Sequence, residues 1–220
     1  MGRLLLWERI MNLLAVMGSP RKGRATDTLV DKAIEGAVHS NLNLSVKKVV
    51  LVDHDIRLCT NCLTCRDRKT DEPFSKCTIR DDMDSIYEDV LASDLLIFGT
   101  PLHMGYVTSL MMVFLERICW TFAKPEGRVL TLSACPIPRS DKKRKSVTIL
   151  TNGIISPIYR KLCDDASPLI KQTVKDSLNA KTVGDLYAGN IEGRGADPYF
   201  DRAFKLGQKL SMAGVKGVRV

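Results

Sequence analysis

The chain has 220 residues, 45% of them hydrophobic, and a formal net charge of +8. This length is enough for one substantial hydrophobic core and short for two, so we expect a single domain over residues 11–220. The positive charge favours anionic ligands, but part of it is concentrated in the runs Arg21–Arg24 and Arg139–Lys145, which argues against a stripe that binds nucleic acid.

The first ten residues contain one short apolar run, Leu4–Trp7, followed by charged residues. Four apolar residues are too few for the core of a signal peptide or for a membrane span. We therefore expect a cytoplasmic protein with no membrane contact. Residues 1–10 are interpreted as an extension in front of the first strand.

The first predicted unit is a buried strand, a basic loop and a helix. Residues 13–17 are continuously apolar, as in a strand covered on both faces, and apolar residues recur at helical spacing from Asp27 onward. The loop between them, residues 18–26, therefore ends at a helix N-terminus. Unpaired backbone N–H groups and the helix dipole favour an anion there.

This loop suits a phosphate group. Ser19 and Thr26 offer hydroxyl donors, and Arg21 and Lys22 offer positive charge. The glycines have the P-loop spacing, but the Lys-Ser/Thr pair that would bind the β/γ-phosphates and magnesium is absent, as is the dinucleotide motif G-x-G-x-x-G. The remaining interpretation is a terminal phosphate monoester bound without metal, with an ordinary basic turn as the alternative.

Apolar runs and helical periodicity alternate along the rest of the chain. Four further strands are predicted, at residues 44–52, 94–99, 147–151 and 181–186. Helices are predicted at residues 82–92, 108–122 and 198–213, with a long helical stretch, broken or bent near Pro168, that ends at Leu178. Residues 123–146 are rich in turn formers and charge and are predicted to be an irregular, basic insertion.

Five strands alternating with helices predict an α/β fold with a parallel sheet, right-handed crossovers and helices on both faces. The flavodoxin-like order 2-1-3-4-5 suits this number and binds its ligand at the carboxyl ends of the strands. Three unusual loops follow the first, third and fourth strands: residues 18–26, 100–106 and 152–153. All three are expected to open on that one edge.

Residues 53–80 form a long loop that contains Cys59, Cys62, Cys65 and Cys77. Such bunching indicates metal or redox use in a reducing compartment rather than a disulfide framework. Cysteines at three-residue steps can wrap a [4Fe-4S] cluster, with a fourth thiolate from farther along the chain. A zinc site and free thiols are the alternatives. The other cysteines are expected to be small buried side chains: Cys119, Cys135 and Cys163.

Five motifs carry a family resemblance: Gly18–Gly23 with Thr26, Cys59-x-x-Cys62-x-x-Cys65, Asp81-Asp82-Met83, Gly99-Thr100-Pro101 and Thr151-x-Gly153. Together they resemble the NAD(P)H-dependent FMN reductases of the flavodoxin-like proteins, and the iron-sulfur flavoprotein branch in particular. The resemblance covers nearly the whole chain from Met11.

The resemblance implies an FMN site built from the three loops. The residues implied at the phosphate are Ser19, Arg21, Lys22, Ala25 and Thr26. Those implied along the isoalloxazine ring are Pro101, Leu102, His103, Met104 and Gly105, and those implied at the ring edge are Thr151, Asn152 and Gly153. His103 stands where relatives commonly carry tyrosine.

The resemblance also implies an FMN-dependent oxidoreductase that passes electrons from NAD(P)H or ferredoxin to another acceptor, in a homodimer or tetramer. The flavin N5 accepts the hydride in such chemistry, so no catalytic acid or base is named. A non-enzymatic carrier is the alternative, in which FMN and an iron-sulfur cluster relay electrons between protein partners.

The basic run Arg139–Lys145 is expected to be solvated surface. It contains no aromatic residue to stack on bases, so contact with nucleic acid is disfavoured. Were this run to reach the cofactor edge, its charge would attract a 2′-phosphate, which favours NADPH over NADH.

Overall fold

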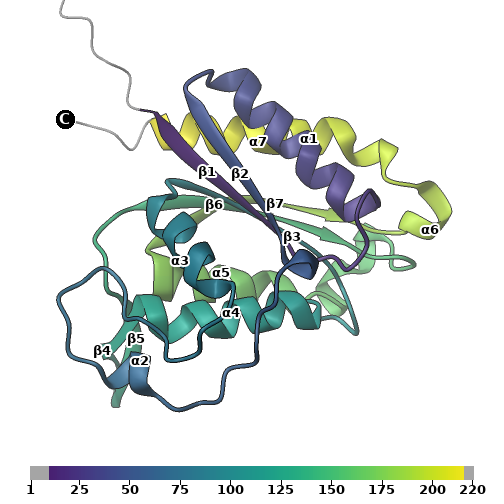
Figure 1. Cartoon of the computed structure of the whole chain (residues 1–220). Helices are drawn as coiled ribbons and strands as arrows, with labels where there is room; N and C mark the ends of the chain where they lie inside the picture. The colour runs from purple at the N-terminus through teal and green to yellow at the C-terminus, as the bar shows by residue number, and fades with distance from the viewer. Residues whose placement is uncertain (1–9, 216–220) are drawn as a thin grey trace, which may run out of the picture.

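The computed structural model describes residues 10–215, which form a five-stranded parallel sheet between two layers of helices (Figure 1). The strands lie in the order β2-β1-β3-β6-β7: β2 Leu44–Val50, β1 Met11–Met17, β3 Leu95–Pro101, β6 Arg144–Thr151 and β7 Ala180–Ala188. The predicted α/β class and the order 2-1-3-4-5 are confirmed. Apart from Ile10, the predicted extension over residues 1–10 lies outside the described residues.

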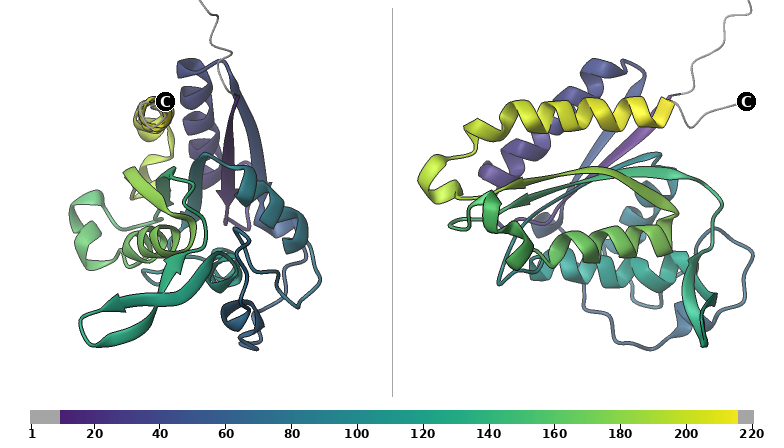
Figure 2. Two further views of the ribbon diagram at one scale, coloured as in Figure 1. Left: turned by 90° about the vertical axis from the view of Figure 1, so that its left-hand side faces the viewer. Right: turned by 180° about the vertical axis from the view of Figure 1, so that it is seen from behind.

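Helices cover both faces of the sheet (Figure 2). One face carries α1 (Ala25–Ser40) and α7 (Phe200–Val215). The other face carries α3 (Met83–Ala92), α4 (Ser109–Phe122) and α5 (Ala166–Leu178). Each face has its own apolar core. A central strand that is buried on both faces has a continuous apolar sequence. The central strands could therefore be predicted from the sequence.

Two glycines let α1 and α7 pack at close range. A Cβ added to Gly36 would overlap the carbonyl oxygen of Phe204, and one added to Gly207 would overlap that of Ala33. Only glycine fits at either position without moving a helix. The first and last long helices are therefore joined backbone to backbone (Figure 2).

Short helical segments fill several connections: η1 Leu51–Asp53, α2 Thr64–Asp67, η2 Pro157–Leu162, α6 Ile191–Arg194 and η3 Asp197–Tyr199. The second strand was predicted to reach Val52, but it ends at Val50. The helical stretch is broken near Pro168, one of the two outcomes predicted, because α5 begins at Ala166. Pro168 thus lies in the first turn, where no intrahelical donor is lost. No helix among residues 10–215 is long and apolar enough to cross a bilayer.

The prediction of an irregular insertion is wrong for residues 123–138. This segment forms an antiparallel hairpin, in which β4 (Ala123–Val129) pairs with β5 (Leu132–Pro138), and it projects from the body of the protein (Figure 2). The sequence did not predict these strands because β4 contains Pro125 and β5 contains Pro136, and proline normally argues against a strand. Both strands are edges of a two-stranded sheet, where a missing N–H is tolerated.

The basic run is solvated surface only in part, because Lys143 is exposed but Arg144 is buried, and Arg144 does not reach the cofactor edge as attraction of a 2′-phosphate would require. Arg144, only 2% exposed, donates to the carbonyls of Ser93 at 3.2 Å and Leu178 at 2.9 Å, at the ends of α3 and α5. It opens β6, so it lies at the amino end of the sheet. Seven residue steps of strand separate it from Thr151 at the carboxyl edge, about 23 Å.

Candidate functional site

The three loops predicted to converge do meet at the carboxyl edge of the sheet. The hydroxyl oxygens of Thr26 and Thr151 are hydrogen-bonded at 2.7 Å, which joins the loop after β1 to the end of β6. Thr108, the N-cap of α4, donates its hydroxyl to the Gly18 carbonyl at 2.6 Å. The Leu102 N–H donates to the Thr151 carbonyl at 2.8 Å. Side-chain and backbone bonds therefore hold the loops in one arrangement.

The loop after β1 is shaped by its own polar groups. The buried Ser19 hydroxyl accepts from the Arg21 N–H at 3.1 Å, and the Gly23 N–H donates to the Asp27 carboxylate at 2.6 Å. Gly23 has a φ of +66°, in the left-handed region that favours glycine. No side chain within residues 10–215 caps α1 at Arg24, so the helix N-terminus stays open to an anion.

The loop's cations differ in their partners. Lys22 forms an ion pair with Asp53 of η1 at 2.8 Å. Arg21 and Arg24 are exposed, and neither has an ion-pair partner in the described part of the chain. These two cations therefore contribute uncompensated positive charge beside the helix N-terminus.

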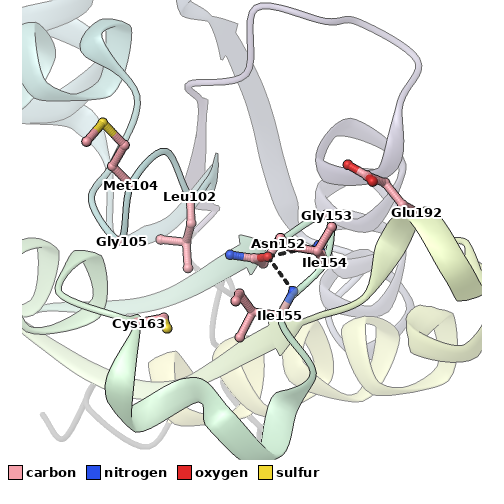
Figure 3. A pocket seen from close by; sticks show the side chains of 9 residues that line it. All are labelled: Leu102, Met104, Gly105, Asn152, Gly153, Ile154, Ile155, Cys163 and Glu192. Atoms are coloured by element: carbon pink, nitrogen blue, oxygen red, sulfur yellow. Dashed lines mark hydrogen bonds between the residues drawn. The ribbon is translucent and has the colours of Figure 1, made fainter.

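A pocket of about 410 Å³ opens beside these loops (Figure 3). Five of the predicted residues line it: Leu102, Met104, Gly105, Asn152 and Gly153. Four lining residues were not predicted as part of the site: Ile154, Ile155, Cys163 and Glu192. The remaining predicted residues do not line it: Ser19, Arg21, Lys22, Ala25, Thr26, Pro101, His103 and Thr151.

Tight backbone turns build the pocket walls. His103 and Tyr106 pair through their backbones at 2.9 and 3.0 Å, so the chain turns at Met104 and Gly105 and leaves Met104 98% exposed. The Asn152 side-chain oxygen accepts from the N–H groups of Ile154 and Ile155, as the dashed lines in Figure 3 show. The Asn152 amide therefore shapes its own turn.

Two of these four lining residues, Glu192 and Cys163, were missed because they lie beside elements whose ends the sequence placed only approximately. The Glu192 N–H donates to the Gly153 carbonyl at 2.9 Å, from the connection after β7. Cys163, expected to be a small buried side chain, is only half-buried and precedes α5. The rule that ligands lie at carboxyl ends of strands could have drawn attention to the loop after β7.

The cysteine loop lies along α4, away from the pocket. Its Ser75 N–H donates to the Thr121 carbonyl at the C-terminal end of α4, whereas Thr108 at the other end contacts Gly18. Fourteen helical residues span about 21 Å. Ser75 of the cysteine loop and Gly18 of the loop after β1 thus lie at opposite ends of this helix.

Two thiols of the loop have shifted pKa values. Burial raises the pKa of Cys65, and the charges of Cys77, Cys59 and Cys62 raise it further. Hydrogen bonds, first from the Thr78 hydroxyl, lower the pKa of Cys62 to about 7. Within residues 10–215, no three His, Cys, Asp or Glu side chains are gathered as metal ligands. Four cysteine thiolates are the ligands that a [4Fe-4S] cluster requires, but the described side chains are not gathered around one point.

Asp81, from the D-D-M motif, fixes the two ends of the cysteine loop. Its carboxylate accepts from the Arg57 N–H at 2.9 Å and pairs with the guanidinium of Arg117 at 2.5 and 3.1 Å. Both side chains of this pair are 1% exposed. Burial acts to raise the pKa of Asp81, but the bond and charge of Arg117 outweigh it and lower that pKa.

The sheet order and the loops at its carboxyl edge define the flavodoxin-like class of ligand-binding proteins. A solved NAD(P)H:quinone oxidoreductase from Methanothermobacter marburgensis is similar in fold, with a TM-score of 0.64 at 14% identity over 91% of this chain and 98% of that one.

The chain belongs to the NADPH-dependent FMN reductase family, whose family model matches residues 11–134. It is 30% identical over 107 residues to the iron-sulfur flavoprotein of Methanosarcina thermophila, covering 49% of this chain and 52% of that protein. It is 32% identical over 108 residues to one from Archaeoglobus fulgidus, covering 49% and 46%. The expected family is confirmed. The chain spans about half the length of these curated relatives.

Proposed function

We propose that the chain binds FMN at the carboxyl edge of the sheet, with the phosphate in the loop after β1 and the ring in the neighbouring pocket. The hydrogen bond between the Thr26 and Thr151 hydroxyls carries this proposal. It joins the loop after β1, which is proposed to hold the phosphate, to the loop after β6, which lines the pocket. The open N-terminus of α1, the Ser19 hydroxyl and the charge of Arg21 supply what a phosphate monoester requires.

The pocket supports the ring part of the proposal. Its volume of about 410 Å³ falls in the range of small-molecule sites. Leu102, Ile154 and Ile155 offer apolar surface, and the turn at Gly105 brings backbone close to the ring position. Pro101 and His103 do not line the pocket. The proposed contacts of these two residues require the ring to extend beyond it.

We propose that the chain is an oxidoreductase that passes electrons from a reduced nicotinamide to another acceptor. Bound flavin would supply hydride acceptance at N5. The protein's part is to hold the phosphate through Ser19, Arg21 and Thr26 and to exclude water with Leu102 and Ile155. Because Arg144 and its basic neighbours lie at the amino end of the sheet, they do not favour NADPH over NADH.

Anaerobic stopped flow separates the enzyme from the electron carrier. NADPH or NADH is expected to bleach the bound flavin at about 1–1000 per second, the usual range of enzyme turnover. Free FMN at equal concentration is the control for uncatalysed reduction. Should neither nucleotide bleach the flavin while reduced ferredoxin does, the carrier function is correct.

The cysteine loop is proposed to hold a [4Fe-4S] cluster on Cys59, Cys62, Cys65 and Cys77. The likeness to two proteins named iron-sulfur flavoprotein supports this ligand set. Cys59 and Cys62 are exposed on a segment without regular secondary structure. All seven cysteines are unpaired, which supports a reducing, cytoplasmic setting.

Iron analysis of anaerobically purified protein tests the cluster. We expect about four irons per chain, and loss of most of the iron in Cys62→Ser, since each thiolate ligates one iron. Cys135→Ser in the hairpin is the matched control and is expected to keep its iron. Full flavin loading without iron would contradict the cluster, and zinc in place of iron would favour the Cys₄ zinc site.

A homodimer or tetramer is proposed from the surface around the pocket. Four exposed apolar side chains belong to the loops that line or flank it: Met104, Ile154, Ile158 and Leu162. Exposed apolar side chains grouped in this way mark interaction sites. A second copy packed there would also shield the pocket from water.

A further inference from the structure

Glu192 brings a negative charge into a pocket wall that is otherwise apolar or uncharged. It is the single Asp, Glu, Lys or Arg among the nine described residues that line the pocket. Its N–H donates to the Gly153 carbonyl at 2.9 Å, and a Cβ added to Gly153 would overlap the Glu192 Oε1. The carboxylate is therefore held directly against the loop after β6, at the pocket wall (Figure 3).

No ion pair compensates this carboxylate within residues 10–215. Arg194 belongs to the same short helix, but residues two apart on a helix do not face each other. Arg160 of η2 is already paired with two carboxylates, those of Asp164 at 2.7 Å and Asp185. The charge of Glu192 is thus available to a molecule that enters the pocket.

The other charged side chains near the pocket do not line it. Asp165 lies behind the turn at Gly105, where a Cβ added to that glycine would be 3.8 Å from the Asp165 Oδ2. Lys161 of η2 is exposed. These two charges are of opposite sign and lie outside the lining, so a molecule in the pocket meets the charge of Glu192 first.

We propose that Glu192 sets the charge selectivity of the pocket, which admits uncharged or cationic electron acceptors and disfavours anionic ones. The inference rests on the proposed function, because that function makes the pocket the place where an acceptor binds. A like charge in a binding site repels the unwanted molecule, and specificity is commonly built in this way. The net charge of +8 acts in the opposite direction, so selectivity against anions is a local property of the pocket.

Thiol labelling of Cys163, which lines the same pocket, measures this charge without flavin. The full chain is treated with two small methanethiosulfonates, one carrying a trimethylammonium group and one a sulfonate, and peptide mass spectrometry follows Cys163 alone. In Glu192→Gln, the ratio of the cationic to the anionic rate is expected to fall at least about threefold, because Glu192 interacts through water as well as through protein. Any change in the thiolate fraction of Cys163 cancels in this ratio.

Two variants and one further cysteine serve as controls. Glu192→Asp retains the charge and is expected to keep the parent ratio. Glu88→Gln removes an exposed carboxylate from α3, and Cys135 in the hairpin reports on thiols outside the pocket; neither ratio is expected to change. At about 1 M salt the Debye length is about 3 Å, so the parent ratio should approach that of Glu192→Gln. A difference that persists in salt would show a change of pocket shape and overturn the proposal.

Acceptor selectivity of the flavin-loaded protein is the second readout. Flavin reduced with stoichiometric dithionite is mixed with a naphthoquinone or its sulfonate, and Glu192→Gln is expected to favour the sulfonate relative to the uncharged quinone at least about threefold. A changed labelling ratio with an unchanged acceptor ratio would show that acceptors bind elsewhere and overturn the proposal.

The two readouts separate this inference from the proposed function. An unchanged labelling ratio in Glu192→Gln overturns the role of Glu192, whether or not the chain binds FMN. A parent protein that takes up no FMN contradicts the proposed function and the selection of acceptors with it. Flavin that is loaded but not reduced by a nicotinamide contradicts only the proposed electron donor, because dithionite supplies the electrons in the acceptor experiment.

Discussion

The double variant Arg21→Gln/Thr26→Val is expected to bind FMN at least about 100-fold more weakly than the parent protein. A hydrogen bond to a charged group contributes about 1.5–3 kcal/mol, and each 1.4 kcal/mol is tenfold in affinity, so loss of two phosphate contacts is enough. Thr26 is 3% exposed, so valine keeps its volume while removing the hydroxyl that meets Thr151. Titration of apoprotein with FMN, followed by flavin fluorescence, measures the change.

A matched variant on the same helix controls for general damage to α1. Thr28→Val/Lys32→Gln also removes one hydroxyl and one cation, but the Thr28 hydroxyl donates only to backbone carbonyls and Lys32 pairs with Glu35. It is expected to bind FMN like the parent. Circular dichroism should show folded protein for both. Parent-like affinity in Arg21→Gln/Thr26→Val would place the phosphate elsewhere.

Arg144→Met is expected to lower the free energy of unfolding by about 3–5 kcal/mol, because each buried acceptor left without a donor costs about 1–3 kcal/mol and Arg144 donates to several carbonyls. Burial lowers the pKa of Arg144 to about 10, so the group is charged at neutral pH. It satisfies carbonyls at the ends of α3 and α5, where the helix dipoles are negative. Methionine fills the space of the stem but leaves these carbonyls buried without a donor.

Denaturant unfolding at neutral pH measures this loss. Whole domains are stable by about 5–15 kcal/mol, so the variant should unfold at a far lower denaturant concentration than the parent. Lys143→Met, at the exposed neighbouring position, is expected to stay within about 0.5 kcal/mol. Equal unfolding midpoints for Arg144→Met and Lys143→Met would show that water replaces the guanidinium at these carbonyls.

The fold could be predicted because its signals are local. Residues 13–17 and 95–98 are apolar throughout because both sides of each strand are covered, and the apolar residues of the helices recur at helical spacing. The site followed from the fold, because parallel strands bring loops distant in sequence to one edge. Thr26 and Thr151 meet there although 125 residues separate them.

The roles of the basic run could not be predicted, because they depend on contacts between distant segments. Arg144 contacts a carbonyl 51 residues before it and one 34 residues after it, and Arg139 reaches one 74 residues before it. In the sequence, both sit among turn formers and charges that resemble an exposed loop. Burial of an arginine is visible only once its carbonyl partners are assembled.

The close contact between α1 and α7 bears on how the protein is made. Gly36 leaves the ribosome early, but the backbone of Phe204 that packs on it follows roughly 170 residues later. At about 5–20 residues per second this takes about 10–30 s of translation. During that time α1, the helix that follows the proposed phosphate loop, lacks the packing of α7 on one side. We therefore expect flavin to be captured after synthesis of the last helix, and a nascent chain stalled before residue 200 to emerge without it.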